Sequence, residues 1–73
     1  MITIHVGKDT GGSNQLLTCE DDGRTFGYAE RDSFKEIIAL GDTLADRYLA
    51  KGFKVDRVRH GGIELEGREG VDG

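Results

Sequence analysis

This chain of 73 residues has a single cysteine, and its sequence shows neither a long apolar run nor a recognisable targeting segment. Cys19 is the only cysteine, which excludes an intrachain disulfide and a zinc site built on several cysteines. No apolar run approaches the roughly 20 residues of a membrane span. The first six residues lack the basic and apolar regions of a signal peptide. We therefore expect a protein of the reducing cytoplasm that does not contact a membrane.

The length of the chain limits the size of its fold. Seventy-three residues are enough for one domain but not for two, and we expect a single domain over residues 1–66. Below roughly 70–80 residues a hydrophobic core rarely provides more than ~3–5 kcal/mol of net stability. With 36% hydrophobic and 33% charged residues, the composition is that of a folded domain with a highly charged surface.

The charge of the chain is negative overall and unevenly distributed. Fourteen acidic and ten basic residues give a net charge of −4, which argues against nonspecific binding to DNA or to anionic membranes. Residues 20–46 contain eight acidic and three basic residues, a net charge of −5. Residues 52–60 contain Lys54, Arg57 and Arg59 against one acidic residue, a net charge of +2.

Alternating apolar residues predict three strands in the first part of the chain. They cover residues 2–6, 15–20 and 24–29, with a glycine-rich loop over residues 7–14. The sequence Asp-Asp-Gly at 21–23 predicts a tight hairpin turn, because Asp-Gly supplies the positive φ angles that such turns need. In the third strand we expect Phe26 and Tyr28 on the inward face.

The spacing of apolar residues predicts one amphipathic helix after these strands. Its apolar stripe consists of Phe34, Ile37, Ile38, Gly41, Leu44, Ala45, Tyr48 and Leu49. Asp32 or Ser33 caps the start, and Gly52 follows the end as a C′ glycine. Gly41 lies on the stripe, which indicates either a close approach to a sheet or a break in the helix.

Residues 53–59 predict a further strand, in which Val58 breaks the alternation and indicates a bulge or an exit from the sheet. A glycine-rich turn at 60–62 and a short strand at 63–66 follow, and the polar tail at 67–73 is expected to be disordered. The fold class that results is α+β, in the order β-β-β-α-β. We expect a small antiparallel sheet of three to four strands packed on one helix.

None of the candidate catalytic or ligand-binding motifs is convincing. The loop containing Lys8 lacks the order of a phosphate-binding loop, since the lysine comes first and a strand follows. Cys19 shares an apolar strand face and is expected to be a small buried side chain. His5 and His60 lie far apart in sequence, and His60 in a glycine-rich turn is expected to be solvated. We expect no enzymatic activity, no cofactor and no metal.

Two features remain, the acidic stretch and the arginine pair. The acidic stretch is either a solvated helix face or a surface that meets a basic partner or imitates a nucleic-acid backbone. Arg57 and Arg59 are alternate residues of a strand, so they project to the same side. Arginine is enriched at interface hot spots because its planar group makes several directed hydrogen bonds.

Residues 52–59, Gly-Phe-Lys-Val-Asp-Arg-Val-Arg, resemble the last strand of the small phage T7-type inhibitors of bacterial host RNA polymerase. Residues 28–30, Tyr-Ala-Glu, lead from a strand into an acidic helix and are similar to the same family. The resemblance covers about residues 15–59. This chain departs from the family in a longer stretch between the two motifs, an additional N-terminal strand and an extension beyond Arg59.

The resemblance implies a phage protein that binds the β′ subunit of RNA polymerase in the cytoplasm of a bacterial host. By motif match, Arg57 and Arg59 contact the polymerase and Glu30 belongs to an acidic strip that repels promoter DNA. Glu36, Asp42 and Asp46 join this strip by their positions on the helix. We expect a monomer that does not bind nucleic acid directly.

Two alternatives to this function stay open. The same acidic face could imitate DNA and inhibit another host nucleic-acid machine, such as a CRISPR effector. The strand and turn with Lys54, Arg57, Arg59 and His60 could instead form a small nucleic-acid-binding module, with binding that weakens steeply as salt rises.

Overall fold

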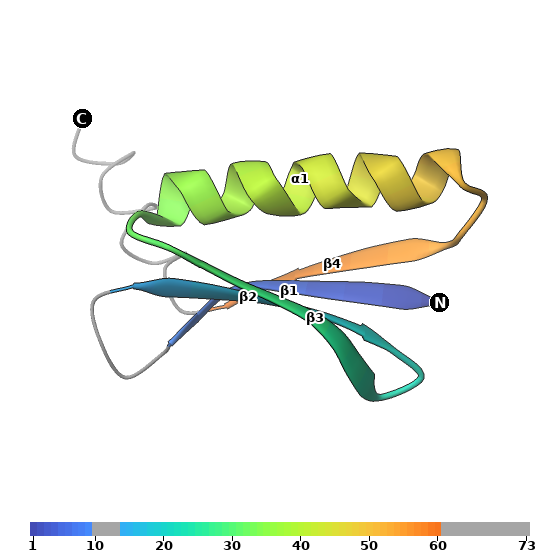
Figure 1. The fold of residues 1–73 in the computed structure, drawn as a ribbon, viewed down its shortest axis with the longest axis horizontal. Coiled ribbons are helices and arrows are strands. Elements are labelled where there is room, and N and C mark those ends of the chain that lie inside the picture. Colours follow the sequence, from blue (N-terminus) through green and yellow to red (C-terminus); the bar gives the residue numbers. More distant parts are fainter. Residues whose placement is uncertain (10–13, 61–73) are drawn as a thin grey trace.

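The computed structural model of the protein describes residues 1–9 and 14–60. The elements are β1 (Ile2–Asp9), β2 (Gln15–Asp21), β3 (Arg24–Arg31), α1 (Phe34–Ala50) and β4 (Val55–Arg59). The helix lies along one face of a single sheet (Figure 1). We call this the helix face of the sheet and the opposite one the far face. The predicted α+β class and the β-β-β-α-β order are confirmed.

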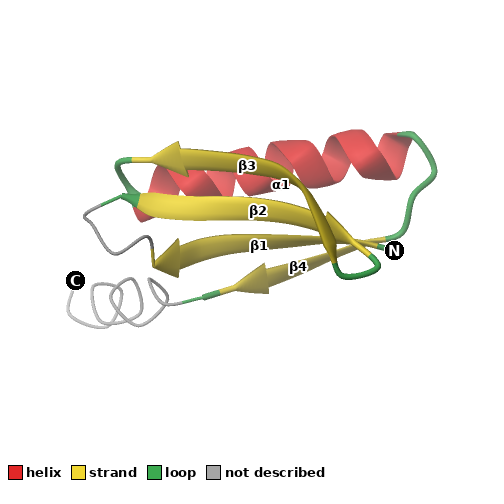
Figure 2. Ribbon diagram, turned by 60° about the horizontal axis from the view of Figure 1, so that its bottom comes forward, coloured by secondary structure: helices red, strands yellow, loops and turns green. Residues whose placement is uncertain are grey.

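The sheet has the strand order β3-β2-β1-β4, so β1 and β2 are central (Figure 2). β1 pairs antiparallel with β2, and β2 pairs antiparallel with β3. β4 pairs parallel with β1, from Ile2 opposite Val55 to Val6 opposite Arg59. The sheet is therefore mixed, and the antiparallel arrangement expected throughout is wrong for this pair. Because α1 runs back along the sheet after β3, β4 has to run in the same direction as β3, and therefore as β1.

The core lies between α1 and the helix face of the two central strands. Alternate residues of β1 and β2 enter it because successive side chains of a strand point to opposite faces. The buried apolar residues are Ile2, Ile4, Val6, Leu17, Cys19, Ile37 and Ala45. The helix stripe supplies partly buried side chains around them, whereas Leu49, predicted to lie on the stripe, is 53% exposed.

Gly41 is buried at the contact between α1 and the sheet. A Cβ atom at this position would lie 2.7 Å from Cγ1 of Val6 and 3.8 Å from Cγ2 of Ile4. The helix continues through Gly41 without interruption. The predicted close approach is confirmed, and the alternative of a helix break is wrong.

Both ends of α1 are capped as the sequence predicts. The backbone N–H of Glu36 donates to Oγ of Ser33 over 3.1 Å, so Ser33 rather than Asp32 is the N-cap. Gly52 follows the helix with a φ of +95°, which a residue with a side chain rarely adopts.

The chain leaves α1 through a Schellman motif that includes Phe53. The N–H of Gly52 donates to the carbonyl of Leu49 over 2.9 Å, and the N–H of Phe53 donates to the carbonyl of Tyr48 over 3.1 Å. The rings of Tyr48 and Phe53 pack edge to face, 6.2 Å apart. Phe53 thus belongs to the helix end, and β4 begins at Val55, two residues later than predicted.

The hairpin between β2 and β3 has the predicted tight turn. Asp22 and Gly23 have φ angles of 54° and 82°, as a type I′ turn requires. A bulge follows, because Cys19 is opposite Gly27 while Glu20 is opposite Thr25.

The bulge separates the two aromatic residues of β3. Phe26 packs against Tyr48 of α1 with ring centroids 6.0 Å apart. Tyr28 is opposite Thr18, whose other neighbour is His5, and it lies on the far face, 61% exposed. The prediction that Tyr28 points inward is therefore wrong.

Two strands differ from their predicted lengths or regularity. β1 continues to Asp9 instead of ending at Val6, with a register shift at Gly7, whose φ is +81°. β4 pairs with β1 without interruption, so Val58 lies opposite His5 on the far face and marks no bulge. The strand expected at 63–66 and the tail at 67–73 lie outside the described residues. Within residues 1–9 and 14–60, no helix combines the length and hydropathy needed to cross a membrane.

We predict that Gly41→Ala destabilises the fold despite the better helix propensity of alanine. The propensity gain is roughly 1 kcal/mol, whereas overpacking against a buried β-branched side chain costs ~1–3 kcal/mol. Urea unfolding of Gly41→Ala, Val6→Ala and the double variant measures the two effects. The added methyl group should be better tolerated in the double variant, because the shortened side chain at position 6 leaves room for it. A Gly41→Ala variant more stable than the parent protein would contradict the close contact.

Candidate functional site

The arginine pair lies on the helix face of the edge strand β4. Arg57 is opposite Ile4 and Arg59 is opposite Val6, both of which point toward α1. Nη1 of Arg57 donates to Oδ1 of Asp42 over 2.6 Å. The Arg57 and Asp42 side chains are 55% and 51% exposed, so water screens their attraction.

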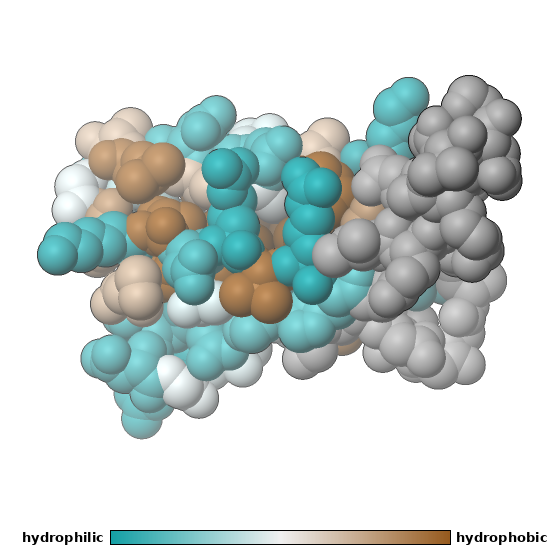
Figure 3. Space-filling view, turned by 180° about the vertical axis from the view of Figure 1, so that it is seen from behind, coloured by the Kyte–Doolittle hydropathy of each residue, from teal (hydrophilic) through white to brown (hydrophobic). Residues whose placement is uncertain are grey.

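A hollow of about 510 Å³ lies between α1 and β4 beside this ion pair. It is lined by Val6, Ile38, Gly41, Asp42, Arg57 and Arg59. On this side of the molecule hydrophilic side chains lie over and beside hydrophobic ones (Figure 3). Asp46 does not line the hollow but follows Asp42 by one helical turn. We call Asp42, Asp46, Arg57 and Arg59 the α1–β4 surface.

The four predicted acidic residues do not form one surface. Asp42 and Asp46 lie one turn apart on α1, so their side chains are neighbours. Glu36 precedes Asp42 by six residues, which turns it by about 240° around the helix axis, to a different side. Glu30 lies on β3, at the opposite edge of the sheet from β4.

Glu30 takes part in its own hydrogen-bonded group. The Tyr28 hydroxyl donates to Oε2 of Glu30, and Nδ2 of Asn14 donates to Oε1 over 3.2 Å. These two bonds favour the ionised carboxylate, and the Tyr28 bond in particular lowers the pKa of Glu30. The same bond to Glu30 raises the pKa of the Tyr28 hydroxyl.

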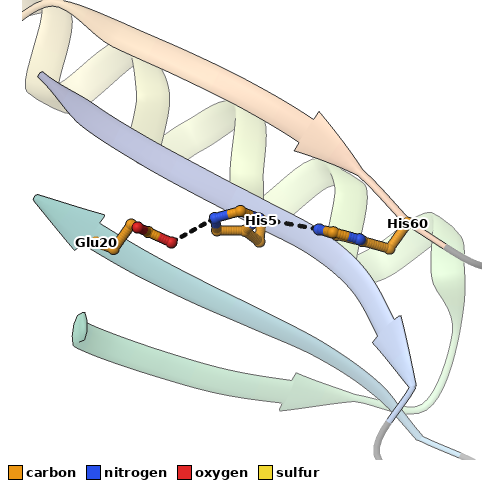
Figure 4. A network of polar contacts seen from close by, with 3 residues as sticks. All are labelled: His5, Glu20 and His60. Atoms are coloured by element: carbon orange, nitrogen blue, oxygen red, sulfur yellow. Dashed lines mark hydrogen bonds and ion pairs between the residues drawn. The ribbon is translucent and has the colours of Figure 1, made fainter. Parts of the chain in front are cut away.

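A histidine pair that the sequence does not reveal lies on the far face of the sheet (Figure 4). Nδ1 of His5 lies 2.9 Å from Nε2 of His60, and Nε2 of His5 lies 2.5 Å from Oε1 of Glu20. His60 is partly buried and bonded, so the expectation of a solvated histidine is wrong. The pair exists because parallel pairing places the end of β4 beside the middle of β1.

An aromatic hollow of about 600 Å³ lies near the N-terminus, the hairpin turn and the end of α1. Tyr48 packs edge to face against both Phe26 and Phe53, which are 50% and 49% exposed. Asp21, Asp22 and Arg24 line it as well, so its charged lining contains both signs. The sequence predicts Phe26, Tyr48 and Phe53 in three separate elements, and it does not predict that their rings pack together.

Groups suited to catalysis or metal binding are few in the part of the chain that the structure describes. Burial of Cys19 raises the pKa of its thiol, which disfavours the reactive thiolate. In residues 1–9 and 14–60, no group of three or more His, Cys, Asp or Glu side chains has an arrangement that could hold a metal ion.

Comparison with known proteins adds no relative to this picture. No family model, no curated protein and no solved structure matches the chain. Its function must therefore be inferred from its residues and their arrangement.

We predict that Tyr28→Phe raises the pKa of Glu30, because the substitution removes the hydrogen bond that stabilises the carboxylate. An NMR titration of the Glu30 side chain measures this shift. Tyr48→Phe is the matched control, since Tyr48 lies in the aromatic hollow on the other face of the sheet. An unchanged Glu30 titration in Tyr28→Phe would show that the hydrogen bond has no effect.

Proposed function

We propose that this protein is a non-enzymatic binding protein that inhibits bacterial RNA polymerase in the cytoplasm of a phage-infected cell. The observation that carries the proposal is the α1–β4 surface, where two arginines of an edge strand lie beside an acidic side of the helix. The likeness of residues 28–30 and 52–59 to the phage T7-type inhibitors is a second ground for the proposal. The confirmed element order supports it as well.

In this proposal Arg57 and Arg59 anchor the protein to the polymerase β′ subunit. A guanidinium group makes two parallel hydrogen bonds to a carboxylate, which is stronger and more specific than a single contact. Arg57 already holds Asp42, but exposed ion pairs of this kind contribute only about 0–1 kcal/mol. A partner carboxylate in a less hydrated interface can therefore replace Asp42 at little cost.

Asp42 and Asp46 then supply the inhibitory charge. When a partner carboxylate takes Arg57, the Asp42 charge is no longer neutralised by its own chain. Two adjacent carboxylates held in a channel that binds DNA lower the local affinity for DNA by Coulomb repulsion. Glu36 and Glu30 lie on other sides of the molecule and contribute less, as the geometry of α1 and β3 requires.

The arrangement of charges disfavours the nucleic-acid-binding alternative. Arg57 and Arg59 lie on the helix face of β4, whereas His60 contacts His5 on the far face. The residues of the 54–60 segment thus do not form one basic surface, and Asp42 neutralises Arg57. Imitation of DNA toward another host machine, such as a CRISPR effector, would use the same acidic side of α1 and is the second candidate.

The same arginines favour a monomer. In an antiparallel pairing of two β4 strands centred on Arg57, the two Arg57 side chains would be directly opposite each other. Like charges directly opposite in a sheet are destabilising. Charged edge strands are a common protection against such pairing.

We predict that Arg57→Glu with Arg59→Glu weakens inhibition of purified bacterial RNA polymerase in a transcription assay by at least about tenfold. An interface arginine of this kind contributes ~2 kcal/mol or more. The matched control is Arg24→Glu with Arg31→Glu, which makes the same charge change on β3 at the opposite edge of the sheet.

Equal effects of the two double variants would contradict the arginine anchor. Absence of inhibition by the parent protein would exclude polymerase as the target. Capture of bacterial proteins on the tagged parent protein, with identification by mass spectrometry, then distinguishes a CRISPR effector from other partners.

A further inference from the structure

The group formed by His5, Glu20 and His60 connects three strands on the far face of the sheet. His5 belongs to β1, Glu20 to β2, and His60 follows the last residue of β4. The side chains of His5 and Glu20 are only 20% and 31% exposed. The backbone N–H of His60 donates to the carbonyl of Val6 over 2.8 Å and continues the pairing of β4 one residue further. The ring contact and this backbone bond together fix the end of the edge strand.

The number of hydrogens between the rings follows from the partners. An ionised Glu20 carboxylate only accepts hydrogen bonds, so Nε2 of His5 must hold a hydrogen. When both rings are neutral, Nε2 of His60 donates to the lone pair on Nδ1 of His5. When one extra proton is bound, a single hydrogen still lies between the two nitrogens, and the contact remains.

A second extra proton cannot be accommodated in the same geometry. A doubly protonated pair has a hydrogen on all four ring nitrogens, because an imidazolium donates at both positions. Two N–H groups would then face each other across 2.9 Å with no acceptor between them. Two positive rings with centroids 5.1 Å apart also repel each other. The contact must open.

We propose that His5, Glu20 and His60 form a pH-sensitive latch, which holds the end of β4 against β1 at neutral pH and releases it in mildly acidic solution. An unperturbed imidazole changes its charge between about pH 5 and 8, which makes this the interval to test.

The neighbouring charges on the far face do not remove this conflict. Asp56 on β4 is opposite Thr3 of β1 and lies on the same far face as His5. Tyr28 and Glu30 on β3 are separated from His5 by β2, and α1 packs on the other face. None of these groups places an acceptor between the two rings.

The direction of the stability change follows from proton linkage. The folded latch resists a second proton that the unfolded chain takes up freely, so the unfolded chain binds more protons in this interval. Stability therefore rises with pH and falls as the solution becomes acidic. Release of His60 also frees the end of the strand that holds Arg59, which makes the α1–β4 surface sensitive to pH.

An NMR titration of the full chain between pH 8 and 5 tests the latch. In the parent protein the two imidazole rings should titrate in two steps separated by about one pH unit or more. The protection factor of the His60 amide should fall at least about tenfold across the second step, whereas central amides of β1 and β2 stay protected.

The variants His60→Gln and His5→Gln each leave one ring, which should titrate in a single step without loss of protection in the end of β4. Both variants test the same point, so a failure of one to fold leaves the other. A single step common to both rings in the parent protein, or an unchanged His60 amide at pH 5, overturns the proposal.

Discussion

The contact between Gly41 and the central strand β1 is the constraint on which the rest of the structure depends. The absence of a side chain at Gly41 lets α1 approach Val6 and Ile4 closely enough to bury three alternate residues of β1. In a domain this small, a larger separation would leave the core incompletely packed. The C-terminal cap of α1 then directs the chain to the start of β1, where the Ile2 N–H donates to the carbonyl of Lys54 and β4 begins to pair.

The parallel pairing of β1 with β4 turns this packing into a site. It places Arg57 within reach of Asp42 on the helix face and His60 within reach of His5 on the far face. One contact joins β4 to the preceding helix α1, and the other joins the end of β4 to the first strand, β1. A single edge strand therefore connects the proposed partner-binding residues to the proposed latch, and its pairing controls both.

Much of the fold could be predicted from the sequence, because local chemistry determines it. The Ser33 cap, the Gly52 end, the Asp22-Gly23 turn and the helix stripe each need only a few neighbouring residues. The errors concern events between strands: the bulge that separates Phe26 from Tyr28, and the direction of β4. The His5–His60 contact was missed for the same reason, since the two residues are 55 positions apart and only strand register brings them together. The six predicted partner-binding residues occupy several surfaces. Charged residues that are close in sequence can point to different sides of a helix or lie at opposite edges of a sheet.

Both proposed sites rest on the parallel register between β1 and β4, which interstrand nuclear Overhauser effects can measure. Parallel pairing predicts contacts whose residue numbers rise together, from Ile2 with Val55 through Ile4 with Arg57 to Val6 with Arg59. Contacts that run in opposite directions, with Ile2 near Arg59 and Val6 near Val55, would contradict it. Such a result would place His60 beyond Ile2, away from His5, and would remove the proposed latch.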